Sequence, residues 1–200
     1  LVLAAGKGTR MRSARAKVLQ RAFELPLLEH VLRAVRPLAP EPLAVVVGHQ
    51  AEQVEQAWSG VGVEFVRQEP QRGTGHAVQS AAKMIARHAE RPLLVVSGDT
   101  PLLRTETLAG LLETHTKRSA AATLLTCELE RPGSYGRVVR SAGGDVERIV
   151  EAVDASASES GLQEVNVGAY VFEVDALQKA LDRLDDRNAQ GELYLTDVIG

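Results

Sequence analysis

Short apolar runs alternate with helical segments through the first half of the chain, and this alternation constrains the fold more than any other feature. Runs of strand length lie at Leu1–Ala5, Leu43–Val47, Val61–Val66 and Leu93–Val96. Segments with the 3.6-residue periodicity of helices separate them, at Leu27–Val35, Ala51–Trp58 and His76–Ile85. Apolar strands separated by helices are typical of a parallel sheet covered on both faces. The first half is therefore predicted to be α/β.

The second half of the chain has a different pattern of predicted elements. A helix is predicted at Thr105–Thr116, and after it strands follow one another with few helices between them, at Ala121–Cys127, Gly136–Arg140, Val146–Val150 and Val165–Val174. This pattern predicts a small mixed β annex. The small and polar stretch Asp154–Gly161 is expected to be a mobile surface loop.

Composition and charge limit the classes of binding partner that this chain is expected to have. The 200 residues are 44% hydrophobic, enough for one sizeable core, and the net charge of −3 provides no basic field for nucleic acid. No apolar run approaches the roughly 20 residues that span a bilayer, so neither a membrane partner nor a signal peptide is expected and a cytoplasmic location follows. The single cysteine, Cys127, lies in an apolar run and is expected to be buried and inert. Small molecules are the expected partners.

A glycine-rich loop follows the first predicted strand. Gly6 and Gly8 allow backbone N–H groups to approach phosphate oxygens, and Lys7 and Arg10 add positive charge. The loop lacks the third glycine of a dinucleotide fingerprint and the Gly-Lys-Ser/Thr of a Walker A loop. The alternative is a glycine-rich turn that binds nothing.

Asp99 follows an apolar strand and a glycine, which places its carboxylate at the carboxyl end of the predicted sheet. Mg²⁺ takes one or two carboxylates together with phosphate oxygens and water, so one aspartate facing a triphosphate would suffice. The alternative is that Asp99 caps the next helix or closes an Asx turn.

The segment Gln71–Ala77 combines a helix start with small residues, and Gln68 lies just upstream of it. Thr74 and free N–H groups of the helix could meet a ligand, and the Gln68 carboxamide offers a donor and an acceptor to the edge of uracil. A simple capped helix is the alternative. Lys17 is either an exposed lysine or one folded over the phosphates, and Glu151, Asn166, Tyr194 and Thr196 taken singly fit ordinary structural roles.

Eight segments together resemble a known family. They are Leu3–Met11, Lys17–Leu19, Gly73–Ala77, Gly98–Leu102, Tyr135–Val138, Ile149–Glu151, Glu164–Gly168 and Asn188–Asp197. Their order and spacing are similar to those in the pyrophosphorylase domain of bacterial bifunctional N-acetylglucosamine-1-phosphate uridylyltransferase/glucosamine-1-phosphate acetyltransferases. The resemblance implies a Rossmann-like, glycosyltransferase-A-like nucleotidyltransferase fold, a three-layer sandwich with a mostly parallel central sheet and a small mixed β annex.

The resemblance also implies a reaction. UMP would pass from UTP to N-acetylglucosamine 1-phosphate, giving UDP-N-acetylglucosamine, a precursor of peptidoglycan and lipopolysaccharide, and pyrophosphate. Arg10, Lys17 and Asp99 would be catalytic, with Asp99 carrying Mg²⁺. Residues expected to bind UTP are Leu3, Ala4, Ala5, Gly6, Gly8, Thr9, Lys17, Gln68, Gly73 and Thr74. Residues expected to bind N-acetylglucosamine are Gly136, Glu151, Asn166, Tyr194 and Thr196.

The sequence departs from that family in two respects. Ala16 stands where a proline usually precedes the lysine, so the loop is expected to be looser. Residues 1–200 are expected to be a nucleotidyltransferase domain truncated at both ends, without the asparagine that provides a second metal ligand and without the β-helical acetyltransferase domain that forms trimers. A monomer is expected for this reason.

Three other functions remain open. One is a sugar nucleotidyltransferase for another nucleotide or sugar, and another is a module that binds a UDP-sugar without turnover. An NAD-dependent dehydrogenase is disfavoured because Met11 occupies the place of the third glycine and because an acidic residue is missing about 20 residues past the loop.

Overall fold

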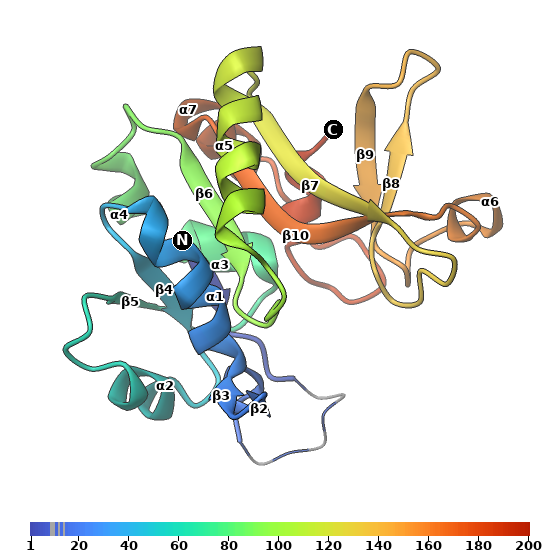
Figure 1. Cartoon of the computed structure of the whole chain (residues 1–200). Helices are drawn as coiled ribbons and strands as arrows, with labels where there is room; N and C mark the ends of the chain where they lie inside the picture. Colours follow the sequence, from blue (N-terminus) through green and yellow to red (C-terminus); the bar gives the residue numbers. More distant parts are fainter. Residues whose placement is uncertain (9–10, 12, 14) are drawn as a thin grey trace.

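The computed structural model describes residues 1–8, 11, 13 and 15–200. One eight-stranded mixed sheet runs through it, in the order β5-β4-β1-β6-β10-β8-β9 with β7 paired to β10. Figure 1 shows the helices packed around the first part of this sheet and the strands β8 and β9 projecting to one side. None of the helices in these described ranges is long and apolar enough to cross a bilayer.

The parallel part of the sheet consists of β1 (Val2–Ala4), β4 (Ala44–Val47), β5 (Glu64–Arg67) and β6 (Leu93–Ser97). Its connections contain α1 (Leu27–Val35), α2 (Ala51–Ala57), α3 (Thr74–Ser80) and α4 (Ala82–Ala86), with short 3₁₀ turns at η2 (Lys17–Leu19) and η3 (Arg36–Leu38). The alternation of strands and helices in the first half thus forms the parallel sheet that the sequence predicts.

The antiparallel part continues the same sheet. It consists of β7 (Ala122–Glu128), β8 (Arg137–Arg140), β9 (Val146–Val150) and β10 (Glu164–Phe172). Three helices and a 3₁₀ turn accompany it, α5 (Thr105–Arg118), α6 (Ala157–Ser160), α7 (Val174–Leu181) and η4 (Leu195–Val198). Strand β10 pairs with β6, so the predicted annex is not a separate sheet. A small separate sheet is formed by β2 (Arg21–Ala22) and β3 (Leu25–Pro26).

Two apolar cores make the molecule a three-layer sandwich. Val45 and Val47 of β4 pack with α1, α2 and α5, whereas Ala44 and Val46 of the same strand pack with α3, α4 and α7. Alternate residues of a strand point to opposite faces of a sheet, so a continuous apolar run supplies both cores.

The structure corrects five expectations about local structure, one of which is the end of the strand predicted at Val165–Val174, because β10 stops at Phe172 and Val174 begins α7. The predicted helix at His76–Ile85 is two helices that meet at Ala81, and the predicted strand at Val61–Val66 begins only at Glu64, after Gly60 and Gly62 adopt positive φ angles of 75° and 71°. The other two concern Asp154–Gly161 and Cys127.

The segment Asp154–Gly161 contains helix α6 where a mobile loop was expected. The Ser156 hydroxyl accepts a hydrogen bond from Glu159 N at 3.3 Å, and the Glu159 carboxylate accepts one from Ser156 N at 2.8 Å. This capping box satisfies N–H groups that the short helix would leave free.

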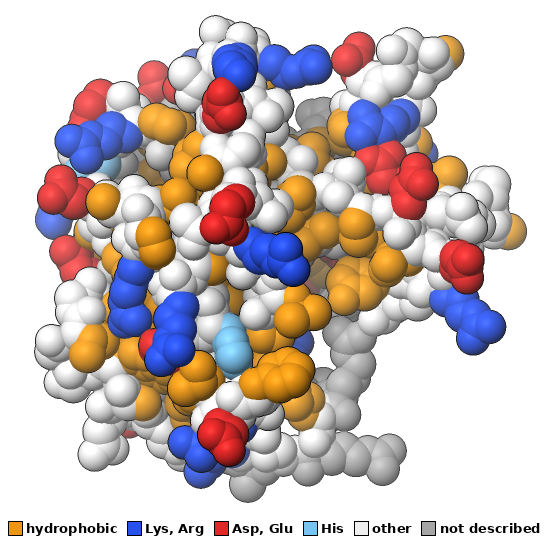
Figure 2. All heavy atoms as spheres, viewed as in Figure 1, with side chains coloured by type: hydrophobic (Ala, Val, Ile, Leu, Met, Phe, Trp, Pro, Cys, Tyr) orange, Lys and Arg blue, Asp and Glu red, His pale blue; other side chains and the backbone are white. Residues whose placement is uncertain are grey.

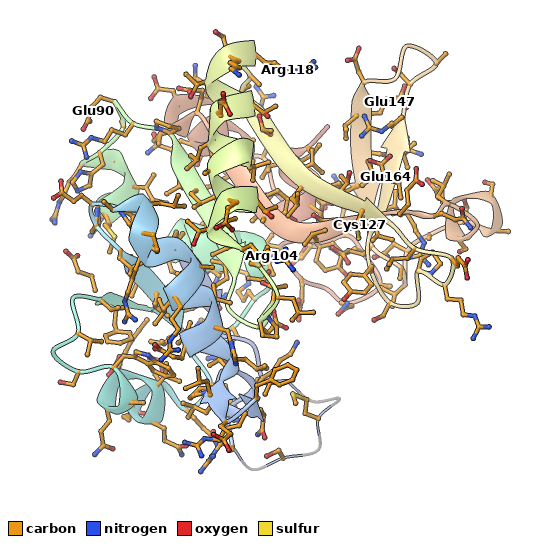
Figure 3. All side chains as sticks on the ribbon, in the orientation of Figure 1. Glu90, Arg104, Arg118, Cys127, Glu147 and Glu164 are labelled. Carbon is orange, nitrogen blue, oxygen red and sulfur yellow. The ribbon has the colours of Figure 1, made fainter. Side chains whose placement is uncertain are left out.

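Cys127 is exposed, contrary to the expectation of a buried thiol. It lies near the end of β7, where the strand runs away from α5 (Figure 1, Figure 3). Helix α5 therefore covers the earlier residues of this apolar run but not Cys127.

Candidate active site

A cavity of about 490 Å³ opens where the parallel and antiparallel parts of the sheet meet. Both parts contribute to its wall, which includes Leu3, Met11, Lys17, Thr74, Ser97, Asp99, Thr100, Ser134, Tyr135, Gly136, Glu151, Asn166, Val167, Gly168, Tyr170, Leu195 and Thr196. It lies at the carboxyl ends of β1 and β6, the position at which α/β sheets bind ligands. A more apolar cavity of about 280 Å³ includes Leu1, Ala44 and Leu93, at the opposite ends of the strands.

An ion pair between Lys17 and Asp99 crosses the wall of this cavity. Asp99 follows β6 through Gly98, whose N–H donates to Leu3 O at 2.8 Å, so the backbone leading to the carboxylate is held against β1. The Nζ of Lys17 contacts Oδ2 of Asp99, and the two side chains are 32% and 27% exposed. Helix α5 has no side-chain cap, so Asp99 does not fill that alternative role.

The two described glycines of the loop differ in what surrounds them. Gly8 has φ of +59°, and a Cβ there would lie 2.6 Å from Cβ of Lys17, so the chain itself requires glycine at this position. A Cβ on Gly6 would meet no atom of the described residues within 4 Å. Space beside Gly6 is consistent with a backbone left open to a ligand. Thr9 and Arg10 lie outside the described residues.

Leu3 contributes to the cavity wall, while Ala4 and Ala5 are 4% and 5% exposed and belong to the two cores. Gly73, with φ of +104°, packs so closely against the C-terminal segment that a Cβ would lie 2.5 Å from Leu193 O. Thr74 lines the cavity, and its hydroxyl accepts a hydrogen bond from Leu195 N at 2.9 Å. The Gly73–Thr74 turn therefore also anchors the segment that carries Thr196.

Gln68 is 3% exposed and lies outside the lining of this cavity. It follows β5, and its N–H donates to Val47 O at 2.8 Å. Its side-chain amide nitrogen lies 2.9 Å from Gly73 O and 3.1 Å from His76 Nδ1. The structure thus adds His76, which the sequence did not single out as a site residue, to the surroundings of Gln68.

The antiparallel part contributes a hydrogen-bonded group of polar side chains. The Thr196 hydroxyl donates to Glu151 Oε1 at 3.0 Å. Burial raises the pKa of Glu151, and the carboxylates of Asp197, Asp154 and Glu192 act in the same direction, whereas the Thr196 hydrogen bond lowers it. The raising effects outweigh this hydrogen bond, so the Glu151 carboxyl holds its proton more tightly than an exposed one does.

Asn166 faces the cavity from an irregular part of β10. Its Nδ2 donates to Tyr170 Oη at 2.6 Å and its Oδ1 accepts from Gly168 N at 3.1 Å. The pairing of β10 with β7 shifts register between Asn166 and Tyr170, and Gly168 adopts φ of +81°. Such a bulge redirects side chains at a strand. Because Tyr170 stands in the apolar stretch Ala169–Phe172, sequence analysis did not single out its hydroxyl.

Gly136 and Thr196 line the cavity as well, but Tyr194 does not. Tyr194 is 6% exposed and borders a second cavity of about 350 Å³, together with Asp154 and the other side of Glu151. The structure thus brings Glu151, Asn166, Gly136 and Thr196 to the cavity of Lys17 and Asp99, with Tyr194 behind this group.

The side chains at the cavity fit one divalent cation that takes most of its ligands from a bound substrate and from water. Across the described part of the chain, no group of three or more His, Cys, Asp or Glu side chains could hold a metal ion. Asp99 nevertheless already stabilises a cation, the ammonium of Lys17. One carboxylate with phosphate oxygens and water is sufficient for Mg²⁺, so the residues present fit this role.

The exterior adds no extended charged surface on the face shown. Blue and red side chains are interspersed in Figure 2, with orange apolar groups between them. This mixed distribution agrees with a ligand bound in a cavity.

Comparisons with known proteins agree with this geometry. The sequence profile of MobA-like NTP transferase domains matches residues 1–191. The chain is 47% identical over 200 residues to the bifunctional protein GlmU of Streptococcus gordonii and 48% identical over 199 residues to that of Streptococcus equi subsp. zooepidemicus. In both comparisons it spans 43% of the relative's length.

A solved structure of UDP-glucose pyrophosphorylase complexed with UDP-glucose superimposes with a TM-score of 0.76 at 17% identity, covering 98% of this chain and 83% of that one. The likeness shows a shared Rossmann-like fold, as the sequence predicts. With the sheet, the cavity at its carboxyl edge and the profile match over nearly the whole chain in agreement, this protein belongs to the family of MobA-like NTP transferase domains.

Proposed function

We propose that this chain transfers UMP from UTP to N-acetylglucosamine 1-phosphate, forming UDP-N-acetylglucosamine and releasing pyrophosphate. The observation that carries the proposal is a single cavity with a Lys17–Asp99 charge pair on one wall and the Glu151, Asn166 and Thr196 group on another. Such a cavity suits a substrate that is charged at one end and neutral and polar at the other. The 47% identity to a GlmU protein over the whole chain supports the same choice.

The proposed chemistry needs no general base. The second pKa of a phosphate monoester is about 6, so the attacking oxygen is already largely deprotonated at neutral pH. That oxygen bonds to the α-phosphorus of UTP while the bond from this phosphorus to the bridging oxygen breaks and pyrophosphate leaves. The main obstacle is repulsion between two anions.

In this proposal, Lys17 and Arg10 bind phosphate oxygens and Asp99 holds Mg²⁺. The cation supplies charge neutralisation when it is bound. Lys17 already lies at the cavity, so its movement from Asp99 to a phosphate would place a positive charge beside the nucleotide. Leu3, the Gly6 and Gly8 backbone and Thr9 surround the nucleotide, with Gln68, Gly73 and Thr74 near the base.

The sugar would lie against Gly136, Glu151, Asn166 and Thr196. Their partners are fixed before any substrate binds, so little ordering is required on binding. Tyr194 supports Glu151 from behind in this proposal. Mg²⁺, a cytoplasmic location and a role in peptidoglycan and lipopolysaccharide precursor synthesis are parts of the same proposal.

An assay with four nucleotides tests it. The chain is incubated with Mg²⁺, N-acetylglucosamine 1-phosphate and UTP, dTTP, CTP or GTP, and pyrophosphate and UDP-sugar are measured. We expect the fastest release of pyrophosphate with UTP. Release mainly from another nucleotide would contradict the proposed substrate, and calorimetric binding of UDP-N-acetylglucosamine without turnover would favour a binding module.

A further inference from the structure

The orientation of the Gln68 carboxamide is determined by its neighbours. A backbone carbonyl can only accept hydrogen bonds, so the side-chain atom 2.9 Å from Gly73 O must be the amide nitrogen. This argument does not depend on how the amide was assigned. The same nitrogen lies 3.1 Å from Nδ1 of His76.

His76 must accept the second hydrogen of that nitrogen. An amide nitrogen carries only donors, so Nδ1 of His76 presents its lone pair and the ring proton is on Nε2. Burial lowers the pKa of His76, and the charge of Arg72 lowers it further, both of which favour the neutral ring. The two partners together use both hydrogens of the carboxamide.

Only the oxygen of the Gln68 carboxamide remains available. No hydrogen bond within the described ranges uses Oε1. This oxygen is also not one of the fully enclosed polar atoms found without a partner there. Within these ranges it therefore has no hydrogen-bond donor as a partner, although Gln68 as a whole is only 3% exposed, and it can accept a hydrogen bond. Sequence reasoning treated Gln68 as both donor and acceptor, whereas the structure leaves only the acceptor.

This oxygen belongs to the segment beside the glycine loop. Gln71 Nε2 donates to Gln68 O at 3.3 Å, and a Cβ on Gly48 would touch both Gln71 Nε2, at 2.8 Å, and the Cβ of Ala5, at 3.0 Å. The backbone of His49 also donates to Ala5 O at 3.2 Å. Gln68 is thus connected to Ala5, which precedes Gly6, through Gln71 and Gly48.

We propose that His76 is a positioning residue for base selection: by holding the Gln68 nitrogen, it leaves an acceptor for the nucleobase. Uracil carries an N–H at N3, whereas cytosine carries a lone pair there, which would face Oε1 acceptor against acceptor. Thymine shares the N3–H of uracil and is not rejected by this contact. The inference rests on the proposed function and deepens it.

Two variants separate positioning from structure. His76→Asn keeps an acceptor oxygen near the position of Nδ1, whereas His76→Leu removes it, so that Gly73 O alone holds the Gln68 nitrogen and the carboxamide can tilt away from its position at the base. We expect His76→Leu to reduce the ratio of kcat/KM for UTP to that for CTP at least about tenfold, through the KM for UTP rather than kcat. His76→Asn should keep most of the ratio. An unchanged ratio in His76→Leu overturns the proposal.

A spectroscopic measurement on the unaltered chain tests the same orientation without catalysis. Long-range ¹H–¹⁵N correlation of the His76 ring should show a proton on Nε2 and none on Nδ1. A proton on Nδ1 overturns the proposal, even if His76→Leu fails to fold. The result also separates the two hypotheses: absence of turnover with every nucleotide contradicts the proposed function, whereas the ring tautomer reports on the Gln68 orientation alone.

Discussion

The two parts of the sheet approach the cavity in different ways. In the parallel part, Lys17 and Asp99 lie in segments outside the strands, and both side chains remain about 30% exposed. In the antiparallel part, Tyr170 lies within β10 and Thr196 in η4, and they are 4% and 3% exposed. The parallel part offers hydrated charges that can exchange partners, and the antiparallel part offers neutral hydrogen-bonding groups held in place.

This contrast explains how one cavity can bind the two ends of a substrate. A pair of partly exposed charges is screened by water and separates at low cost, so it can be replaced by a metal and phosphates. Buried polar groups are costly to leave without partners and therefore stay paired. Four substitutions test this contrast between the two parts.

Asp99→Asn should have the largest effect. Removing the charge that holds the proposed cation should lower the rate of pyrophosphate release by about a hundredfold or more, because compensation of charge is the main requirement of the reaction. The thermal midpoint should change little, since the carboxylate is partly hydrated. Asp182→Asn, at an exposed position, is the matched control. Turnover retained by Asp99→Asn would rule out this role for Asp99.

Thr196→Val should act mainly on stability. The half-buried Glu151 carboxyl loses the donor at 3.0 Å, and the free energy of unfolding should fall by about 1–3 kcal/mol. Thr114→Val on the exposed face of α5 should change it by less than about 0.5 kcal/mol. Denaturant titration measures both. Equal values for the two variants would mean that the antiparallel wall is not held by this hydrogen bond.

Lys17→Met should improve the binding of a divalent cation in the absence of nucleotide. The ammonium and the cation compete for Oδ2 of Asp99, so we expect affinity for Mn²⁺ to rise about severalfold, while nucleotide affinity falls. Calorimetry or the paramagnetic resonance of free Mn²⁺ measures the change, with exposed Lys83→Met as control. Unchanged Mn²⁺ affinity would show that the pair in the parallel part is not exchangeable.

Glu151→Gln should have the smallest effect and should concern pH. Because burial raises the folded-state pKa of Glu151 above 4.5, stability is greatest with the carboxyl protonated and declines as pH rises from 4.5 through the raised pKa. In the variant, stability should decline less steeply with rising pH. A smaller decline should remain because burial also raises the pKa of Asp197. Thermal midpoints across pH give the slope, and exposed Glu130→Gln should keep it. A slope as steep as in the unaltered chain would contradict the burial of Glu151.

Local patterns predicted much of the fold because they are consequences of burial. The helix expected at Leu27–Val35 and the strand expected at Val146–Val150 have those limits in the structure. The strand expected at Val165–Val174 was wrong at its end, since it stops at Phe172 and Val174 begins α7. Val174 is apolar because α7 packs on the second core, and periodicity alone does not separate a short buried helix from a strand.

Apolar patterning was enough to predict the parallel half of the sheet and the position of Asp99, because apolar strands must be buried and their carboxyl ends meet at one edge. Motif resemblance added Glu151, Asn166 and Thr196. The folded structure was needed to show that Lys17 pairs with Asp99, that Asn166 lies beside Tyr170 at the bulge in β10, and that His76 contacts the Gln68 carboxamide. These contacts depend on side-chain direction and on segments brought together by folding, which residue order does not specify.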